Sequence, residues 1–152
     1  MESLSAQSRK EEGLRGCLDA LRSAPINLQC LKLLGNLGKL SDWVAGLQNL
    51  VKLKLQYTKL TDLDGTIQVL GKLPNLSILC LLTYSFRVEE PKHFSSRQGA
   101  FPSLTVLELG YNVGIALVEF EEGTLPKLEV LLSRSSLISF SGLSSLPCLK
   151  EV

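Results

Sequence analysis

The sequence predicts an α/β solenoid, a curved stack of short parallel strands with short helices and irregular segments on its outer side. Two observations lead to this prediction. Leucine makes up 34 of the 152 residues, whereas aromatic residues make up only 6%. The spacing Leu-x-x-Leu-x-Leu, with small deviations in the later units, recurs from Leu28, Leu50, Leu76, Leu104, Leu128 and Leu149. A pattern that returns roughly every 20–29 residues is typical of a leucine-rich repeat, in which each unit buries its apolar side against its neighbours.

The repeats divide the chain into two parts. Residues 25–152 are predicted to hold five leucine-rich repeats and the start of a sixth. Residues 1–24 are predicted to hold an N-terminal helix over 8–23, because Ser8 and Glu11 have the spacing of a capping box and leucines follow at helical intervals. This helix is either the remnant of a preceding repeat, whose strand would lie upstream of the chain, or a separate N-terminal cap.

The strand of each repeat should place its leucines in the core and the residues between them on the opposite, concave face. Read in this register, the first two strands expose mainly basic residues and the later strands mainly apolar ones, with Cys30, Cys80 and Gly110 also on this face. An exposed apolar patch of this size is typical of a protein contact. We therefore predict that a protein partner binds through Lys32, Leu34, Lys52, Lys54, Gln56, Ile78, Leu82, Val106, Glu108, Val130, Leu132 and Arg134.

Two alternatives to this predicted binding face stay open at the level of sequence. An error of one residue in the strand register would move these side chains into the core. A segment outside the chain would also cover the apolar positions if the array were truncated.

The segments that return between strands are predicted on the convex side. Residues 41–47 and 64–72 each begin with a favourable N-cap residue and should form one or two helical turns. Residues 110–124 and 133–145 are rich in Gly, Ser and aromatic residues and should be irregular. Residues 83–100 form the longest connection, which we expect to be the most mobile one. Three aromatic side chains should fill the convex side of the core: Phe94, Phe120 and Phe140.

Leucine-rich repeats often carry an asparagine after the strand, where its side chain bonds backbone groups of the neighbouring unit. Asn36 and Asn112 occupy this position, but Thr58, Tyr84 and Ser136 replace it in the other repeats. The sequence therefore predicts an incomplete asparagine ladder and an arc of uneven curvature.

Charge and cysteine spacing restrict the partners and the cellular compartment. The formal net charge of +1 argues against nucleic acid or an anionic membrane as the main partner. The sequence contains no apolar run of membrane-spanning length. Four cysteines at Cys17, Cys30, Cys80 and Cys148 form no C-x-x-C pair, which predicts free thiols in a reducing compartment rather than a zinc site or a disulfide framework.

The sequence contains no motif that indicates a catalytic site. His93 is the only histidine, it lies in a polar connection, and no nucleophile motif accompanies it. No Gly-rich phosphate-binding sequence is present, because Gly38-Lys39 and Gly71-Lys72 are each followed by leucine. We expect a protein without enzymatic activity and without a bound cofactor or metal.

The residues between the repeated leucines show a more specific resemblance to a known family. Over residues 12–152 the chain resembles the C-terminal repeats of plant intracellular nucleotide-binding leucine-rich-repeat receptors of the coiled-coil type, which are disease resistance proteins. The likeness depends on the long connection before Phe101 and on the repeat openings Leu73-Pro74, Phe101-Pro102, Leu125-Pro126 and Leu146-Pro147.

This resemblance implies a cytoplasmic module of innate immunity that recognises a pathogen effector or a guarded host protein, or that packs on the nucleotide-binding module of the same receptor. The chain departs from the family because it contains no nucleotide-binding module and no coiled-coil signalling domain, so ATP binding and cell-death signalling do not follow. The competing interpretation is a free-standing scaffold that bridges host proteins and is unrelated to immunity. In either case we expect self-association through uncapped solenoid ends, where Leu149 and Val152 lie.

Overall fold

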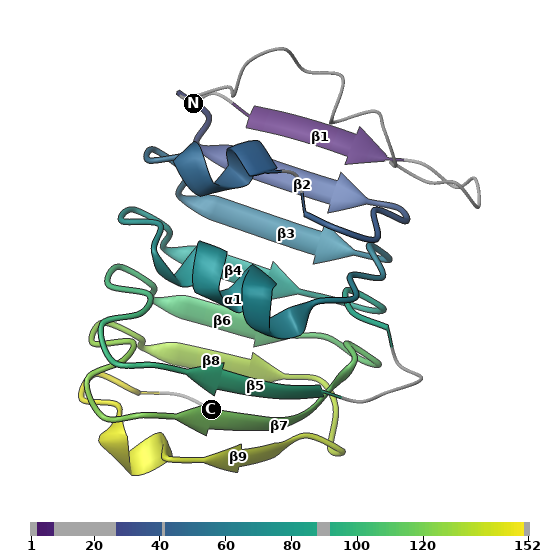
Figure 1. Ribbon diagram of the computed structural model, residues 1–152. Coiled ribbons are helices and arrows are strands. Elements are labelled where there is room, and N and C mark those ends of the chain that lie inside the picture. The colour runs from purple at the N-terminus through teal and green to yellow at the C-terminus, as the bar shows by residue number, and fades with distance from the viewer. Residues whose placement is uncertain (1–2, 8–26, 41, 88–91, 151–152) are drawn as a thin grey trace.

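The computed structural model describes residues 3–7, 27–40, 42–87 and 92–150 (Figure 1). In these residues strands and return segments alternate, and the two resulting layers enclose a core of leucines. One layer is a six-stranded sheet, and the other consists of helical turns followed by a three-stranded sheet. No helix in this described part of the chain is long and apolar enough to cross a bilayer. The predicted α/β solenoid is confirmed.

The first layer, called the main sheet below, is parallel throughout. Its strands in spatial order are β1 (Ser3–Gln7), β2 (Cys30–Leu34), β3 (Lys52–Gln56), β4 (Ile78–Leu81), β6 (Val106–Leu109) and β8 (Val130–Ser133). The register aligns equivalent leucines of successive repeats, so that Leu53 lies between Leu31 and Leu79. Since side chains alternate between the two faces of a strand, one face carries these leucines, with Ala6 and Ser133 at equivalent positions of β1 and β8, and the other carries the residues between them.

The second layer changes character along the chain. It begins with the 3-10 helix η1 (Asp42–Gly46) and the α-helix α1 (Leu63–Gly71), and continues with strands β5 (Lys92–Ser96), β7 (Ile115–Phe120) and β9 (Ser139–Ser141), before the short 3-10 helix η2 (Leu143–Ser145). Figure 1 shows α1, β5, β7 and β9 in front of the main sheet. Buried residues of both layers belong to one hydrophobic cluster, so this layer covers the leucine-bearing side of the sheet. This layer is the predicted convex side.

The core between the layers consists mainly of the repeat leucines. Leu31, Leu53, Leu79, Leu107 and Leu131 are completely buried, and the leucines two positions later in the first four of these repeats are buried as well. Phe94 and Phe120 are buried on the convex side, and the half-buried Phe140 packs against the same cluster. The prediction that these three phenylalanines belong to the core is confirmed.

The prediction of irregular convex segments was wrong. Residues 110–124 contain β7 and residues 133–145 contain β9, and both strands belong to one parallel sheet with β5. β5 lies within the connection at 83–100, so part of that connection is paired; its residues 88–91 lie outside the described part.

A common inward row explains why these segments pair. Phe94, Val118 and Phe140 lie opposite one another across the three strands, and the first two are buried. Burying this apolar row brings the three backbones side by side, and their peptide groups then form hydrogen bonds with one another instead of remaining unpaired. The apolar alternation within each single segment is too short to predict that the three segments pair as strands.

The N-terminal part differs from its prediction where the structure describes it. β1 pairs with β2 in parallel, with Leu4 opposite Leu31, so the chain itself supplies a strand that had been expected upstream of it. The helix predicted over 8–23 lies outside the described residues.

Of the two predicted convex helices, α1 begins earlier in the chain than expected. Asp62, rather than Asp64, is the N-cap of α1: its Oδ1 accepts a hydrogen bond of 3.0 Å from the backbone N–H of Gly65. The N-cap therefore lies two residues earlier than predicted, and Leu63, the first residue of α1, is buried. η1 begins at Asp42, and position 41 lies outside the described residues.

Hydroxyl side chains take over part of the asparagine ladder. The buried Thr58 donates from Oγ1 to the backbone carbonyl of Ser85, at 2.9 Å. Ser85, also buried, donates from Oγ towards the carbonyls of Leu55 and Leu82, at 2.8 and 2.7 Å. In the third repeat, Ser85 thus takes the role of the ladder asparagine, one residue after Tyr84. Thr58 and Ser85 keep hydrogen bonds between neighbouring repeats at two positions where asparagine is absent.

Candidate protein-interaction surface

The main sheet presents a continuous face away from the core, which we call the concave face. The register aligns its side chains in rows that cross the strands. One row consists of Cys30, Lys52, Ile78, Val106 and Val130, and the next consists of Lys32, Lys54, Cys80, Glu108 and Leu132. Leu34 and Gln56 lie opposite each other at the carboxyl ends of β2 and β3, and Leu82, Gly110 and Arg134 follow the ends of β4, β6 and β8.

Three lysines, Lys32, Lys52 and Lys54, form a basic patch on β2 and β3. Lys32 is exposed and the other two are half-buried. Lys32 and Lys54 are direct cross-strand neighbours, an arrangement in which like charges repel. None of the ion pairs between described residues includes a lysine of the basic patch. Within the described ranges, the patch therefore carries positive charge that no carboxylate pairs with.

The residues predicted to be apolar and accessible on the later strands form a second area, which we call the apolar patch: Ile78, Leu82, Val106, Val130 and Leu132. All five are half-buried, whereas the leucines that alternate with them are buried. The strand register is therefore the predicted one, and the side chains of the apolar patch lie outside the core. Their half-exposed surface is the kind that a partner protein covers.

Between the two patches lies a small polar group. The nearly buried Cys80 lies opposite both Lys54 and Glu108. Burial raises the pKa of the Cys80 thiol, the Glu108 carboxylate raises it further, and Lys52 and Lys54 act in the opposite direction. Arg134 Nε lies 3.1 Å from Glu108 Oε1, so the acidic group of this row already has a cationic partner.

Gly110 shapes the edge of the concave face. A Cβ atom at this position would lie 2.7 Å from the Cα of Leu82, a backbone contact that side-chain rotation cannot relieve. Glycine thus allows the backbones that follow β4 and β6 to approach each other. Its presence in the predicted face reflects packing rather than partner contact.

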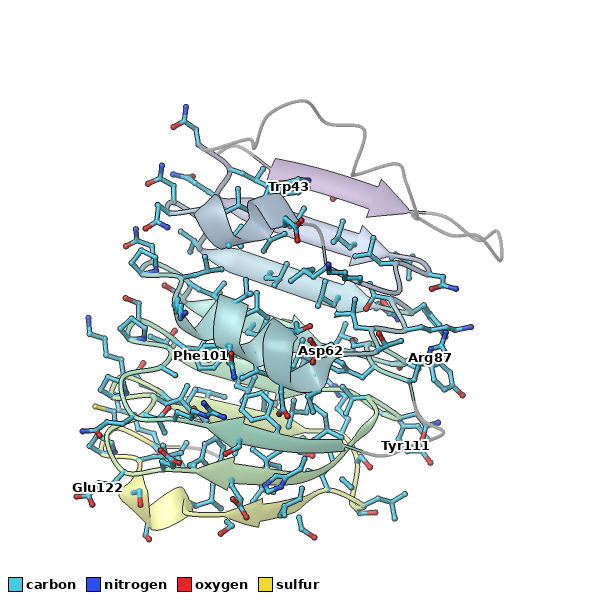
Figure 2. The ribbon with its side chains drawn as sticks, in the orientation of Figure 1. Trp43, Asp62, Arg87, Phe101, Tyr111 and Glu122 are labelled. Carbon is cyan, nitrogen blue, oxygen red and sulfur yellow. The ribbon has the colours of Figure 1, made fainter. Side chains whose placement is uncertain are left out.

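Sequence reasoning missed an aromatic rim beside the concave face. Tyr57, Tyr84 and Tyr111, which are all the tyrosines of the chain, follow the carboxyl ends of β3, β4 and β6. Tyr57 and Tyr111 are exposed by 42% and 61%, and the ring centroids of Tyr57 and Tyr84 lie 5.6 Å apart. Figure 2 shows Tyr111 and Arg87 at this edge of the molecule. The constant interval of 27 residues between the tyrosines was the available signal.

In the described part of the chain, His93 and the two buried cysteines lie on different layers. His93 lies on the convex side, where its Nε2 is 3.2 Å from Glu119 Oε2 and both side chains are about half exposed. Cys30 and Cys80 are buried free thiols and Cys148 is an exposed one, while Cys17 lies outside the described residues. In the described ranges no group of three or more His, Cys, Asp or Glu residues is placed to hold a metal ion.

A cleft of about 460 Å³ opens on the convex side where the second layer changes from α1 to β5. Asp64 and Gln68 of α1 and its C-cap residue Lys72 line one side of the cleft, and Ser95 and Arg97 line the opposite side. The lining carries both signs of charge on accessible side chains. It is a consequence of packing a helix beside a strand, and none of the predicted binding residues contributes to it.

Comparison with protein families agrees with this geometry. The family model described as "Leucine-rich repeat region" matches residues 1–152. The chain belongs to the leucine-rich repeat family. Such regions are in general non-catalytic modules that bind other proteins. Neither the search of curated proteins nor the search of solved structures found a significant match.

Proposed function

We propose that this leucine-rich repeat chain recognises a protein partner through its concave face. The observation that carries the proposal is that one continuous face joins a basic patch, which forms no ion pair among the described residues, to a partly exposed apolar patch. Protein contacts commonly combine an apolar area, which gains free energy from burial, with charged groups that select the partner. On the convex sheet, the outward side chains of β5 and β7 include the ion pair of His93 and Glu119.

The biological setting that we propose is plant innate immunity, on the strength of the resemblance in the repeat openings. The partner would then be a pathogen effector, a guarded host protein, or the nucleotide-binding module of the same receptor, and the protein would act in the cytoplasm. A contact with the nucleotide-binding module would make the concave face regulatory.

The test is affinity capture from plant tissue with three forms of the chain. The first is the wild type, and the second carries Ile78→Asp with Leu132→Asp on the apolar patch. The third carries Leu117→Asp with Ser139→Asp, which are outward neighbours on β7 and β9. Circular dichroism of all three establishes that the fold is retained.

We expect the wild type and the convex variant to retain the same partner and the concave variant to lose it. Equal capture by all three forms would refute binding through the concave face. The identity of the captured protein then tests the setting: an effector, a guarded protein or a nucleotide-binding module supports the immune role, whereas a bridge between housekeeping proteins supports the scaffold.

A further inference from the structure

We propose that the partner presents an acidic segment that continues directly into an apolar one, and that this segment lies in extended form across the strands of the main sheet. Its carboxylates contact the basic patch and its apolar side chains cover the apolar patch. This inference rests on the proposed function, since it names the chemistry of the partner for the same face.

The charge distribution on the concave face indicates carboxylates. Lys32 and Lys54 are held as direct neighbours by the strand register, and Lys52 is on the same face two residues before Lys54. Like charges placed opposite each other destabilise a sheet, so a partner that brings negative charge relieves an existing repulsion. Glu108, the only carboxylate in the aligned rows of this face, is already paired with Arg134, and no other described carboxylate forms an ion pair with the basic patch.

The order of the strands determines the order of the partner's residues. From the amino-terminal end of the main sheet, β2 and β3 carry the lysines, and β4, β6 and β8 carry Ile78, Val106 and Val130 in a single row. In this row the transition from charged to apolar occurs in one step, between Lys52 and Ile78, whereas in the neighbouring row Cys80 and Glu108 lie between Lys54 and Leu132. A segment in which acidic and apolar residues were evenly mixed would place carboxylates on the apolar patch. These carboxylates would lose their hydration and gain no opposite charge in exchange.

The dimensions of the sheet give the length of the segment. Neighbouring strands lie roughly 4.8 Å apart, so the distance from β2 to β8 is about 19 Å, and an extended chain rising about 3.3 Å per residue covers it with roughly six residues. Because successive side chains of an extended chain point to opposite sides, about half of them face the sheet, so a run of two to three acidic residues followed by three to four apolar ones places side chains of each kind over the matching patch. A nucleic acid also supplies negative charge, but its phosphates repeat along the strand and have no counterpart on the apolar half.

The experiment measures fluorescence anisotropy of a labelled synthetic peptide, Asp-Glu-Asp-Leu-Val-Leu, titrated with the full chain. A peptide with Asn and Gln in place of its acids tests the charges, and a peptide with Ser in place of its apolar residues tests the other half. A six-nucleotide single-stranded oligonucleotide tests the competing polyanion.

Two charge variants are matched. Lys32→Glu/Lys52→Glu/Lys54→Glu alters the basic patch, and Lys39→Glu/Lys72→Glu/Lys127→Glu makes the same change in net charge at exposed positions outside the main-sheet strands. Lys32→Gln/Lys52→Gln/Lys54→Gln repeats the first change without introducing acids, in case the reversed variant does not fold.

We expect the concave variants and both altered peptides to weaken binding by about tenfold or more, and the control variant to change it less than about twofold. Equal loss in the control variant, or oligonucleotide binding as tight as peptide binding, would overturn the inference. The two proposals fail separately: peptide binding that ignores the lysines, together with partner capture that still requires Ile78 and Leu132, refutes the acidic segment and leaves concave recognition standing.

Discussion

Arg134 and Glu108 are joined across the neighbouring strands β8 and β6, with the guanidinium Nε 3.1 Å from the carboxylate Oε1. Arg134 is 67% exposed and Glu108 is 21% exposed, so the pair lies at the surface with its acidic end partly covered. The consequence concerns charge more than stability. Arg134 neutralises the acid that would otherwise lie between the basic patch and the apolar patch.

Replacing Arg134 by Gln should therefore have little effect on folding. Surface ion pairs contribute about 0.2–1 kcal/mol, so we expect the free energy of unfolding in urea to fall by no more than about 1 kcal/mol. Binding of the acidic peptide should weaken, because Glu108 then repels it. The variant Glu108→Gln with Arg134→Gln removes this repulsion and should restore binding; a double variant as weak as the single one would contradict the assignment.

Gly110→Ala should damage the fold more than an alanine at another glycine. The new Cβ would lie 2.7 Å from the backbone of Leu82, and relieving such an overlap requires the backbone to move, at a cost of about 1–3 kcal/mol. Gly46→Ala is the matched control, because its Cβ would meet no atom within 4 Å. Urea denaturation of both variants measures the difference, and equal stability of the two would show that the close approach at Gly110 is not required.

Thr58→Val tests whether hydroxyl groups support the stack where asparagine is missing. Valine keeps the shape of the side chain but removes the buried donor to the Ser85 carbonyl, and an unmade buried hydrogen bond costs about 1–3 kcal/mol. Thr61→Val is the control, since Thr61 makes a longer bond of 3.3 Å at an exposed position. Thermal or urea unfolding that is equally affected in both variants would exclude a special role for Thr58.

The main sheet could be predicted from sequence because its signal is local. Leu53 and Leu55 are separated by one residue that points the other way, and the same local alternation returns in the neighbouring repeats. One strand therefore predicts its neighbours, and the whole concave face follows from the register. The basic and apolar patches occupy the predicted positions for this reason.

The convex sheet and the aromatic rim could not be predicted in the same way. Phe94 pairs with Val118 across the connection between two repeats, and nothing near Phe94 in the sequence indicates that partner. Tyr57 and Tyr84 have backbone φ angles of 57° and 53°, in the left-handed region that non-glycine residues rarely adopt. The neighbouring repeats stabilise these turns, with the Tyr57 N–H donating to Thr83 and the Tyr84 N–H to Asn112. Hydrogen bonds between repeats stabilise these turns, so the residues of a single turn do not predict its conformation.

Cys80 gives a prediction that depends on pH. Its thiol pKa is raised above the ordinary value of 9.0 by burial and by Glu108, so in the folded chain the thiol keeps its proton at a pH where the unfolded chain has lost it. The contribution to stability is therefore complete below about pH 9 and declines as pH rises through the folded pKa. Between about pH 9 and the folded pKa, unfolding releases a proton from this thiol, so unfolding becomes more favourable as the pH rises.

The measurement compares the pH dependence of the free energy of unfolding in the wild type, Cys80→Ala and Cys148→Ala. Above pH 9 the wild type and Cys148→Ala should lose stability more steeply than Cys80→Ala, because Cys148 is exposed. Lysine and tyrosine titration is common to all three proteins and cancels in the comparison. Alkylation by iodoacetamide should likewise modify Cys148 before Cys80 at alkaline pH. Parallel stability curves, or equal alkylation of the two thiols, would show that neither burial nor Glu108 holds the proton on Cys80.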